Sequence, residues 1–124
     1  MRFLSVFDQN SPTPAIDPTR DRLDSATCTR LSAYLRAGVR LMGTTQKVPD
    51  VLTESSTPIV PISIHTDGEY VWSMAVAYYV ETHRISTGEE FLVHCASNGW
   101  TVPSLSFAEV EEGLAFVNAS RPTP

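Results

Sequence analysis

The stretch TDGEYVWSMAVAYYV, residues 66–80, decides the fold of this chain. Its Asp67-Gly68 dipeptide is a preferred pair for a two-residue type I′ β-turn. The turn lies between IVPISIHT, residues 59–66, which is rich in β-branched residues, and the extended run EYVW, residues 69–72. The stretch therefore predicts a β-hairpin over about 59–72 in which Gly68 has a positive φ angle.

A two-residue turn also predicts which residues face each other across the hairpin. Thr66 is then opposite Glu69, and His65 is opposite Tyr70. Because side chains alternate along a strand, paired residues share a face of the sheet. One predicted face carries Ile62, Ile64 and Val71, and the other carries Ser63, His65, Tyr70 and Trp72. Pro61 has no N–H to donate, so an edge or a strand end is expected there.

Capping residues and apolar periodicity predict four helices. Asp24 or Ser25 caps a first helix that runs to about Ala37, and Ser73 caps a second one directly after the hairpin. The second helix is apolar on nearly every side, which predicts a central position. Two further helices start at pairs with the spacing of a capping box. These pairs are Ser86 with Glu89, for a helix near 87–98, and Ser106 with Glu109, for a helix near 107–118.

These elements predict the α+β class, with a small antiparallel sheet packed against three to four helices in one domain. The globular domain is expected over residues 25–119. Residues 1–24 are expected to form an N-terminal arm, because the segment 8–22 holds three prolines and few apolar residues. Residues 120–124 are expected to be a C-terminal tail.

Composition places the chain among ordinary globular proteins. It has 124 residues, of which 42% are hydrophobic, and its first residues hold one arginine and only a short apolar run. A secretory signal or a membrane span needs a longer apolar segment, so a cytoplasmic protein is expected. The two cysteines, Cys28 and Cys95, have neither a zinc-binding nor a redox spacing, and a cytosol would keep them reduced.

The charge is concentrated in the second half of the chain. Residues 1–62 carry seven Lys and Arg against six Asp and Glu, a balance of +1, whereas residues 63–124 carry two against eight, a balance of −6. The sum is the net charge of −5. An acidic half disfavours nucleic acid as a partner and suits a protein with a basic surface, although a solvated surface has the same composition.

The candidate chemical groups form no complete catalytic or metal-binding set. The three histidines, His65, His83 and His94, lack the spacing of metal ligands, so neither a metal nor a cofactor is predicted. An enzyme or small-ligand site would use the face of Ser63, His65, Tyr70 and Trp72, near Asp67 and Glu69. No nucleophile elbow or glycine-rich phosphate loop accompanies these residues.

Two other surfaces suggest binding functions. Residues 73–99 have the order of a helix-turn-helix, but the second helix begins with two glutamates and carries no basic residue.

In the last helix, Phe107, Val110, Leu114 and Val117 share one face, while Glu109, Glu112 and Phe116 point to the opposite side. Either a neighbouring segment covers Phe116, or the helix frays after Gly113, or Phe116 is an aromatic anchor with a charged rim.

Four segments resemble a recurring pattern in small actinobacterial proteins. They are PDVL at 49–52, TDGEYVW at 66–72, AYYVETH at 77–83 and EEFLVH at 89–94. The resemblance covers about residues 31–100. Those proteins often have tryptophan at the position of Tyr70 and proline at the position of Ser73, differences that are conservative for the fold. The resemblance implies no established activity, but some members are similar in size and acidity to immunity proteins of toxin systems.

The sequence therefore favours a non-enzymatic, acidic cytoplasmic protein that binds another protein, and an immunity protein that neutralises a toxin fits this description. The residues expected to contact the partner are Asp67, Glu69, Glu109, Glu112 and Phe116. Two alternatives stay open. One is an enzyme or ligand binder that uses the His65, Tyr70 and Trp72 face, and the other is a helix-turn-helix-like regulator.

Overall fold

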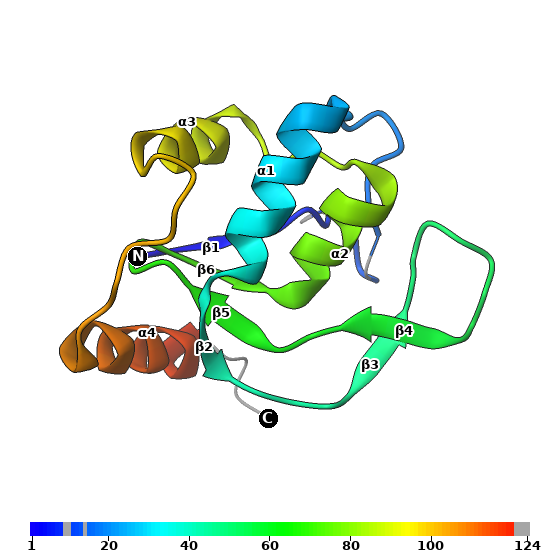
Figure 1. Cartoon of the computed structure of the whole chain (residues 1–124). Helices are drawn as coiled ribbons and strands as arrows, with labels where there is room; N and C mark the ends of the chain where they lie inside the picture. The colour runs from blue at the N-terminus through cyan, green and yellow to red at the C-terminus, as the bar shows by residue number, and fades with distance from the viewer. Residues whose placement is uncertain (9–10, 14, 121–124) are drawn as a thin grey trace.

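A computed structural model describes residues 1–8, 11–13 and 15–120, and its centre is a four-stranded mixed sheet (Figure 1). The strand order is β1-β6-β5-β2. β5 pairs antiparallel with β2 and β6, whereas β1 pairs parallel with β6. The α+β class is confirmed, but the sheet is not purely antiparallel. The strands are β1 (Arg2–Leu4), β2 (Val39–Met42), β5 (Ile64–Thr66) and β6 (Tyr70–Ser73).

A separate two-stranded ribbon consists of β3 (Lys47–Pro49) and β4 (Pro58–Pro61). The predicted single strand of the hairpin over 59–66 is thus divided between two sheets, because β4 pairs with β3 and β5 pairs with β6. Pro61 is the last residue of β4. A proline that cannot donate to a ladder explains why strand pairing stops and the chain changes sheets there.

Helices cover both faces of the main sheet. α1 (Ser25–Arg36), α2 (Met74–His83) and α3 (Glu89–Ser97) lie on one side, and α4 (Phe107–Ser120) lies on the other, as Figure 1 shows. α4 rests against β2, where a Cβ atom at Gly113 would come within 3.0 Å of Leu41. Within the described residues, no helix is long and apolar enough to cross a membrane.

The hairpin has a different register from the predicted one. Thr66 pairs with Val71, His65 with Trp72 and Ile64 with Ser73, so the loop contains residues 67–70 rather than 67–68. Gly68 has the expected positive φ of 99°, but Asp67 is not among the residues with positive φ, so the turn is not type I′. A shift of two residues preserves the faces, since side chains alternate with a period of two.

The face predicted to hold a ligand is the core of the protein. Trp72 is fully buried, and its indole N–H donates to the carbonyl of Leu35 on α1. His65 bonds through Nδ1 to the carbonyl of Gly38 and through Nε2 to the hydroxyl of Ser63. Helices α1 and α3 thus pack against this face, and the residues of the alternative ligand site, His65, Tyr70 and Trp72, are buried in the core.

Side-chain caps start three of the four helices. The Asp24 carboxylate accepts from the Thr27 N–H, and the Ser73 hydroxyl accepts from the Ala75 N–H, both as expected. Ser106 and Glu109 exchange two hydrogen bonds, which confirms that capping box. The box of Ser86 with Glu89 is wrong, because α3 begins after Gly88 without a side-chain cap. Ser86 instead accepts from the N–H of Gly88 itself.

The N-terminal residues belong to the folded domain rather than to an arm. β1 is an edge strand of the main sheet, and Val6 and Ile16 are buried in the core. The segment is also tied to the turn between α2 and α3, since the Leu23 N–H donates to the Arg84 carbonyl and the Ser86 N–H donates to the Asp21 carbonyl. At the other end α4 extends to Ser120, and residues 121–124 lie outside the described residues.

The apolar stripe predicted for the last helix is only partly buried. Val117 is buried, but Phe107 is 79% exposed. Phe116, which was expected to project outward, is half-buried and packs on Phe3 of β1 with ring centroids 5.0 Å apart. A segment of this chain thus covers part of the Phe116 ring. Helical periodicity alone could not reveal this contact, because β1 was not predicted.

Candidate functional site

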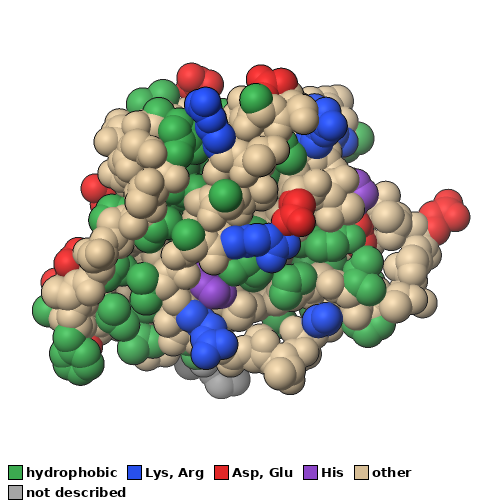
Figure 2. All heavy atoms as spheres, viewed as in Figure 1, with side chains coloured by type: hydrophobic (Ala, Val, Ile, Leu, Met, Phe, Trp, Pro, Cys, Tyr) green, Lys and Arg blue, Asp and Glu red, His purple; other side chains and the backbone are tan. Residues whose placement is uncertain are grey.

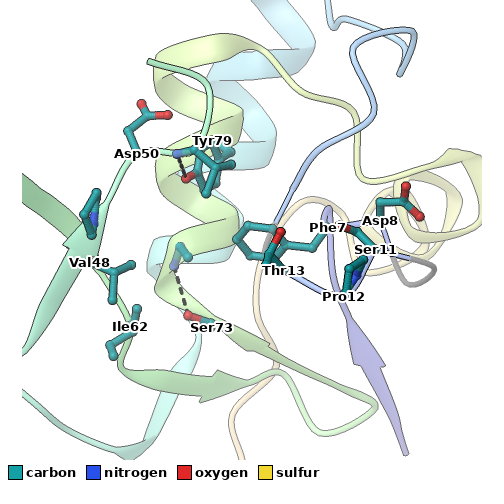
Figure 3. Close-up of a pocket in the computed structure, with 13 residues that line it drawn as sticks. Phe7, Asp8, Ser11, Pro12, Thr13, Val48, Asp50, Ile62, Ser73 and Tyr79 are labelled. Atoms are coloured by element: carbon teal, nitrogen blue, oxygen red, sulfur yellow. Dashed lines mark hydrogen bonds between the residues drawn. The ribbon is translucent and has the colours of Figure 1, made fainter. Parts of the chain in front are cut away.

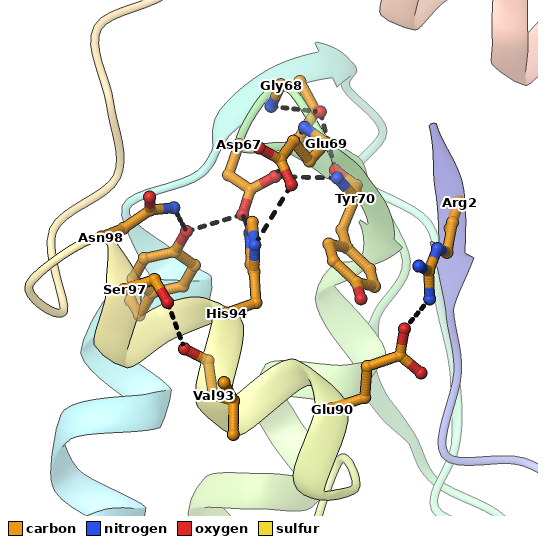
Figure 4. Close-up of polar contacts among 12 residues, drawn as sticks. Arg2, Asp67, Gly68, Glu69, Tyr70, Glu90, Val93, His94, Ser97 and Asn98 are labelled. Carbon is orange, nitrogen blue, oxygen red and sulfur yellow. Dashed lines mark hydrogen bonds and ion pairs between the residues drawn. The ribbon is translucent and has the colours of Figure 1, made fainter.

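A buried carboxylate supports the loop between β5 and β6. Oδ1 of Asp67 accepts from the N–H groups of Glu69 and Tyr70, at 2.9 and 2.8 Å. Oδ2 accepts from the Tyr34 hydroxyl and faces Nε2 of His94, both at 2.6 Å (Figure 4). The side chain of Asp67 is fully buried. Groups from α1, α3 and the loop itself therefore hold this turn in one conformation.

Hydrogen bonding keeps the buried Asp67 carboxylate ionised. Burial raises its pKa, but the bonds from Tyr34, from the two loop N–H groups and from His94 outweigh burial and leave the pKa below its ordinary value. Burial and the bond to Asp67 raise the pKa of Tyr34. Burial also raises the pKa of the nearby Cys95 thiol to about 12, so this cysteine is not a nucleophile.

The supported loop presents an exposed carboxylate. The Glu69 side chain is 73% exposed, and its Oε2 lies 3.3 Å from Nδ1 of His94. Both ring nitrogens of His94 therefore face carboxylates, as Figure 4 shows. An imidazole engaged in this way holds the loop against α3 and does not direct a nitrogen at a substrate as a general base would.

A shallow cleft of about 380 Å³ opens beside this loop, between β1 and α3. We call it the turn cleft. Two of its lining residues, Met1 and Val93, are exposed apolar side chains at 42% and 55%. Arg2 spans the cleft, since its guanidinium lies over the Tyr70 ring and pairs with Glu90. The lining residues are Met1, Arg2, Gly68, Glu69, Tyr70, Glu90, Val93 and His94.

Two carboxylates line the turn cleft together with the cation of Arg2, and a third carboxylate lies next to it. Glu69 comes from the loop, and Glu90 comes from α3. Glu109 of α4 approaches from a third side, with its Oε2 3.5 Å from the position that a Cβ atom would take at Gly68. Figure 2 shows acidic groups along the edge of the molecule on the side of α4, next to apolar side chains. The fold thus assembles an acidic surface with apolar groups beside it.

A second buried aspartate lies at the C-terminal end of α2. Oδ2 of Asp50 accepts from the Tyr78 hydroxyl at 2.8 Å and faces Nε2 of His83 at 2.6 Å. Its Oδ1 accepts from the N–H of Leu52. Burial raises the pKa of Asp50, yet these bonds lower it overall. The cluster connects the loop after β3 to α2, and within the described residues no group of three His, Cys, Asp or Glu side chains could hold a metal ion.

The structure brings together some of the residues predicted to contact a partner and separates others. Glu69 and Glu109 lie at the same end of the hairpin, beside Gly68. Asp67 lies below that surface, where Tyr34, His94 and two loop N–H groups engage its carboxylate. Phe116 packs on Phe3, and Glu112 is exposed on α4.

Sequence reasoning missed the partners of both aspartates. His94 is 27 residues from Asp67, and His83 is 33 residues from Asp50, so no local spacing reveals either pair. Both pairs nevertheless fall within the four segments that resemble the actinobacterial pattern. Each of the four segments thus supplies a member of a buried polar cluster.

The second helix of the helix-turn-helix alternative exposes acidic rather than basic side chains. Most of α2 is buried, and the described side chains that α3 exposes include Glu89, Glu90 and Val93.

Comparison with protein-family models, with curated proteins and with solved structures finds no match to this chain.

Proposed function

We propose that this protein acts by binding a basic protein at the turn cleft. The observation that carries the proposal is the convergence of Glu69, Glu90 and Glu109, from three elements, around a loop that the buried Asp67 supports. Protein interfaces combine apolar contacts with a polar rim, and Met1 and Val93 supply exposed apolar groups here. A supported loop also loses little conformational entropy on binding, which favours affinity.

The charge pattern specifies the chemistry of the partner. Carboxylates around a concave surface attract lysine and arginine side chains and accelerate the encounter with a basic protein. An immunity protein that blocks a basic toxin is the role we propose for this surface, in line with the resemblance to small acidic actinobacterial proteins. The cytoplasm is the proposed location, and the two buried, unpaired thiols are compatible with a reducing compartment.

Charge reversal of Glu69 is expected to weaken partner binding at least about 30-fold. The partner is captured at low salt from an extract of the source organism, identified, purified and titrated calorimetrically against each variant. Glu69→Lys places a cation opposite a basic surface, and like charges across an interface cost several kcal/mol. Glu54→Lys is the matched control, because it makes the same charge change in the exposed loop of the β3–β4 ribbon.

Three results would contradict this function. One is the absence of a stoichiometric protein partner, and another is equal binding by Glu69→Lys and Glu54→Lys. The third concerns the immunity role. If the partner is toxic when expressed alone, the wild-type chain should restore growth and Glu69→Lys should not. Equal rescue by both would show that neutralisation does not use the turn cleft.

A further inference from the structure

A second and larger pocket lies between the N-terminal segment, the end of β3 with the loop that follows it, and α2 (Figure 3). Its volume is about 700 Å³. Sites for small molecules generally have volumes of about 300–1,000 Å³. Apolar side chains from four parts of the chain form most of the wall, namely Phe7, Val48, Val51, Ile62 and Ala75.

Ser73 supplies a polar group within this apolar wall. It is half-buried at the start of α2, between Ile62 and Phe7 in Figure 3. Its hydroxyl oxygen accepts from the Ala75 N–H as a helix cap. Among the described residues, no acceptor takes the hydroxyl proton of Ser73. A ligand atom with a lone pair, such as a carbonyl oxygen, would complete the hydrogen bonding of this group.

The described charged groups at the pocket disfavour an anionic ligand. The charged residues that line it are Asp8 and Asp50, both acidic, and no lysine or arginine is among the described lining residues. The Asp50 carboxylate is engaged by Tyr78, His83 and the Leu52 N–H, so it provides negative potential rather than a vacant acceptor. A bound anion would be repelled without gaining a cationic partner, and an apolar wall disfavours any buried charge.

We propose that this pocket binds a neutral, largely apolar small molecule whose carbonyl or similar acceptor receives the hydroxyl proton of Ser73. The site shares no residue with the turn cleft and is independent of the protein-binding function proposed above. A protein with both sites would connect a small molecule and a protein partner within one domain.

Two neutral fluorescent naphthalenes test the site. Prodan carries a ketone, and N-phenyl-1-naphthylamine has no carbonyl group. We expect both to bind the wild-type chain saturably at one site, with emission shifted to the blue. Ile62→Trp fills the pocket and should weaken both probes at least about tenfold. Ile59→Trp is the matched control, because Ile59 is exposed and does not line the pocket, and it should change neither affinity more than about twofold.

Ser73→Ala tests the polar contact. Removing one hydrogen bond should weaken prodan about fivefold and leave N-phenyl-1-naphthylamine within about twofold. The second probe controls for the lost helix cap, since any distortion of α2 would weaken both probes. Val51→Trp, at an exposed lining position, provides a second blocking variant if Ile62→Trp does not fold. Glu69→Lys should leave both affinities unchanged, which separates this site from the turn cleft.

Each other outcome overturns the proposal. Failure of the wild-type chain to bind either probe saturably would remove the site. Equal affinities in Ile62→Trp and Ile59→Trp, or in Val51→Trp and Ile59→Trp, would place the probes elsewhere. Equal weakening of the two probes by Ser73→Ala would remove the carbonyl contact, and weakening by Glu69→Lys would assign the probes to the turn cleft.

Discussion

Replacing Asp67 with alanine is expected to lower the free energy of unfolding by about 3–5 kcal/mol. The change removes the acceptor of two loop N–H groups and leaves the Tyr34 hydroxyl and His94 Nε2 without their shared partner. Buried polar groups that lose their partners pay the full cost of desolvation. Urea unfolding followed by circular dichroism at neutral pH measures this loss.

Glu69→Ala is the control for this experiment. It removes a carboxylate two positions along the same loop, but that side chain is 73% exposed. Exposed ion pairs contribute about 0–1 kcal/mol, so its stability should remain within about 1 kcal/mol of the wild type. A loss below about 1 kcal/mol for Asp67→Ala would contradict the assignment of Asp67 as the support of the loop.

Replacing Trp72 with alanine is likewise expected to lower the free energy of unfolding by about 3–5 kcal/mol. The indole is fully buried, donates to the Leu35 carbonyl and packs against Phe91 with centroids 5.9 Å apart. Removing it leaves a cavity beneath α1 and α3 and takes away one of the donors to the Leu35 carbonyl. The free energy of unfolding, measured in urea by circular dichroism, gives the loss.

Trp100→Ala makes the same substitution at a half-buried position after α3. Its ring contacts the Arg30 guanidinium at 6.0 Å, and we expect a loss of less than half that of Trp72→Ala. Similar losses for the two variants would show that the face of Trp72 is not the main core. A stable Trp72→Ala protein would restore the idea that this face is an open ligand pocket.

The parts of the fold that the sequence predicted depend on local chemistry. Asp24 and Ser73 cap their helices with their own side chains, and Gly68 adopts the positive φ that its turn requires. These features involve residues two or three positions apart, so their pattern is visible in one short segment. Alternation also predicted correctly that His65 and Trp72 share a face, because a shift of two residues does not alter it.

The remaining features depend on contacts between distant residues. β1 has three residues and pairs with β6, almost seventy positions along the chain, which no local pattern reveals. The predicted hairpin register was wrong because the Asp67 carboxylate turns inward and accepts from the loop N–H groups. The loop is therefore longer than an Asp-Gly turn normally gives. The sequence did not predict the contact of Phe116 with Phe3, because Phe3 belongs to β1, which was not predicted.

The acidic cleft was only partly predictable for the same reason. The excess of carboxylates in the second half of the chain is visible in composition, and Glu69 and Glu109 were both selected as candidates. Their proximity depends on where α4 packs, and the role of Glu90 depends on α3 lying beside β1. Apolar composition alone could not predict the pocket next to α2, because the N-terminal segment forms one of its walls and the course of that segment was not predicted.

Carboxyl footprinting of the chain with and without its partner tests the central claim most directly. A carbodiimide couples glycine ethyl ester to accessible carboxylates, and mass spectrometry reports the extent at each glutamate. We predict that the bound partner slows labelling of Glu69 and Glu109 at least about fivefold and leaves Glu54, in the β3–β4 loop, unchanged. Protection of Glu54 with unchanged labelling of Glu69 and Glu109 would contradict the assignment of the turn cleft as the binding surface.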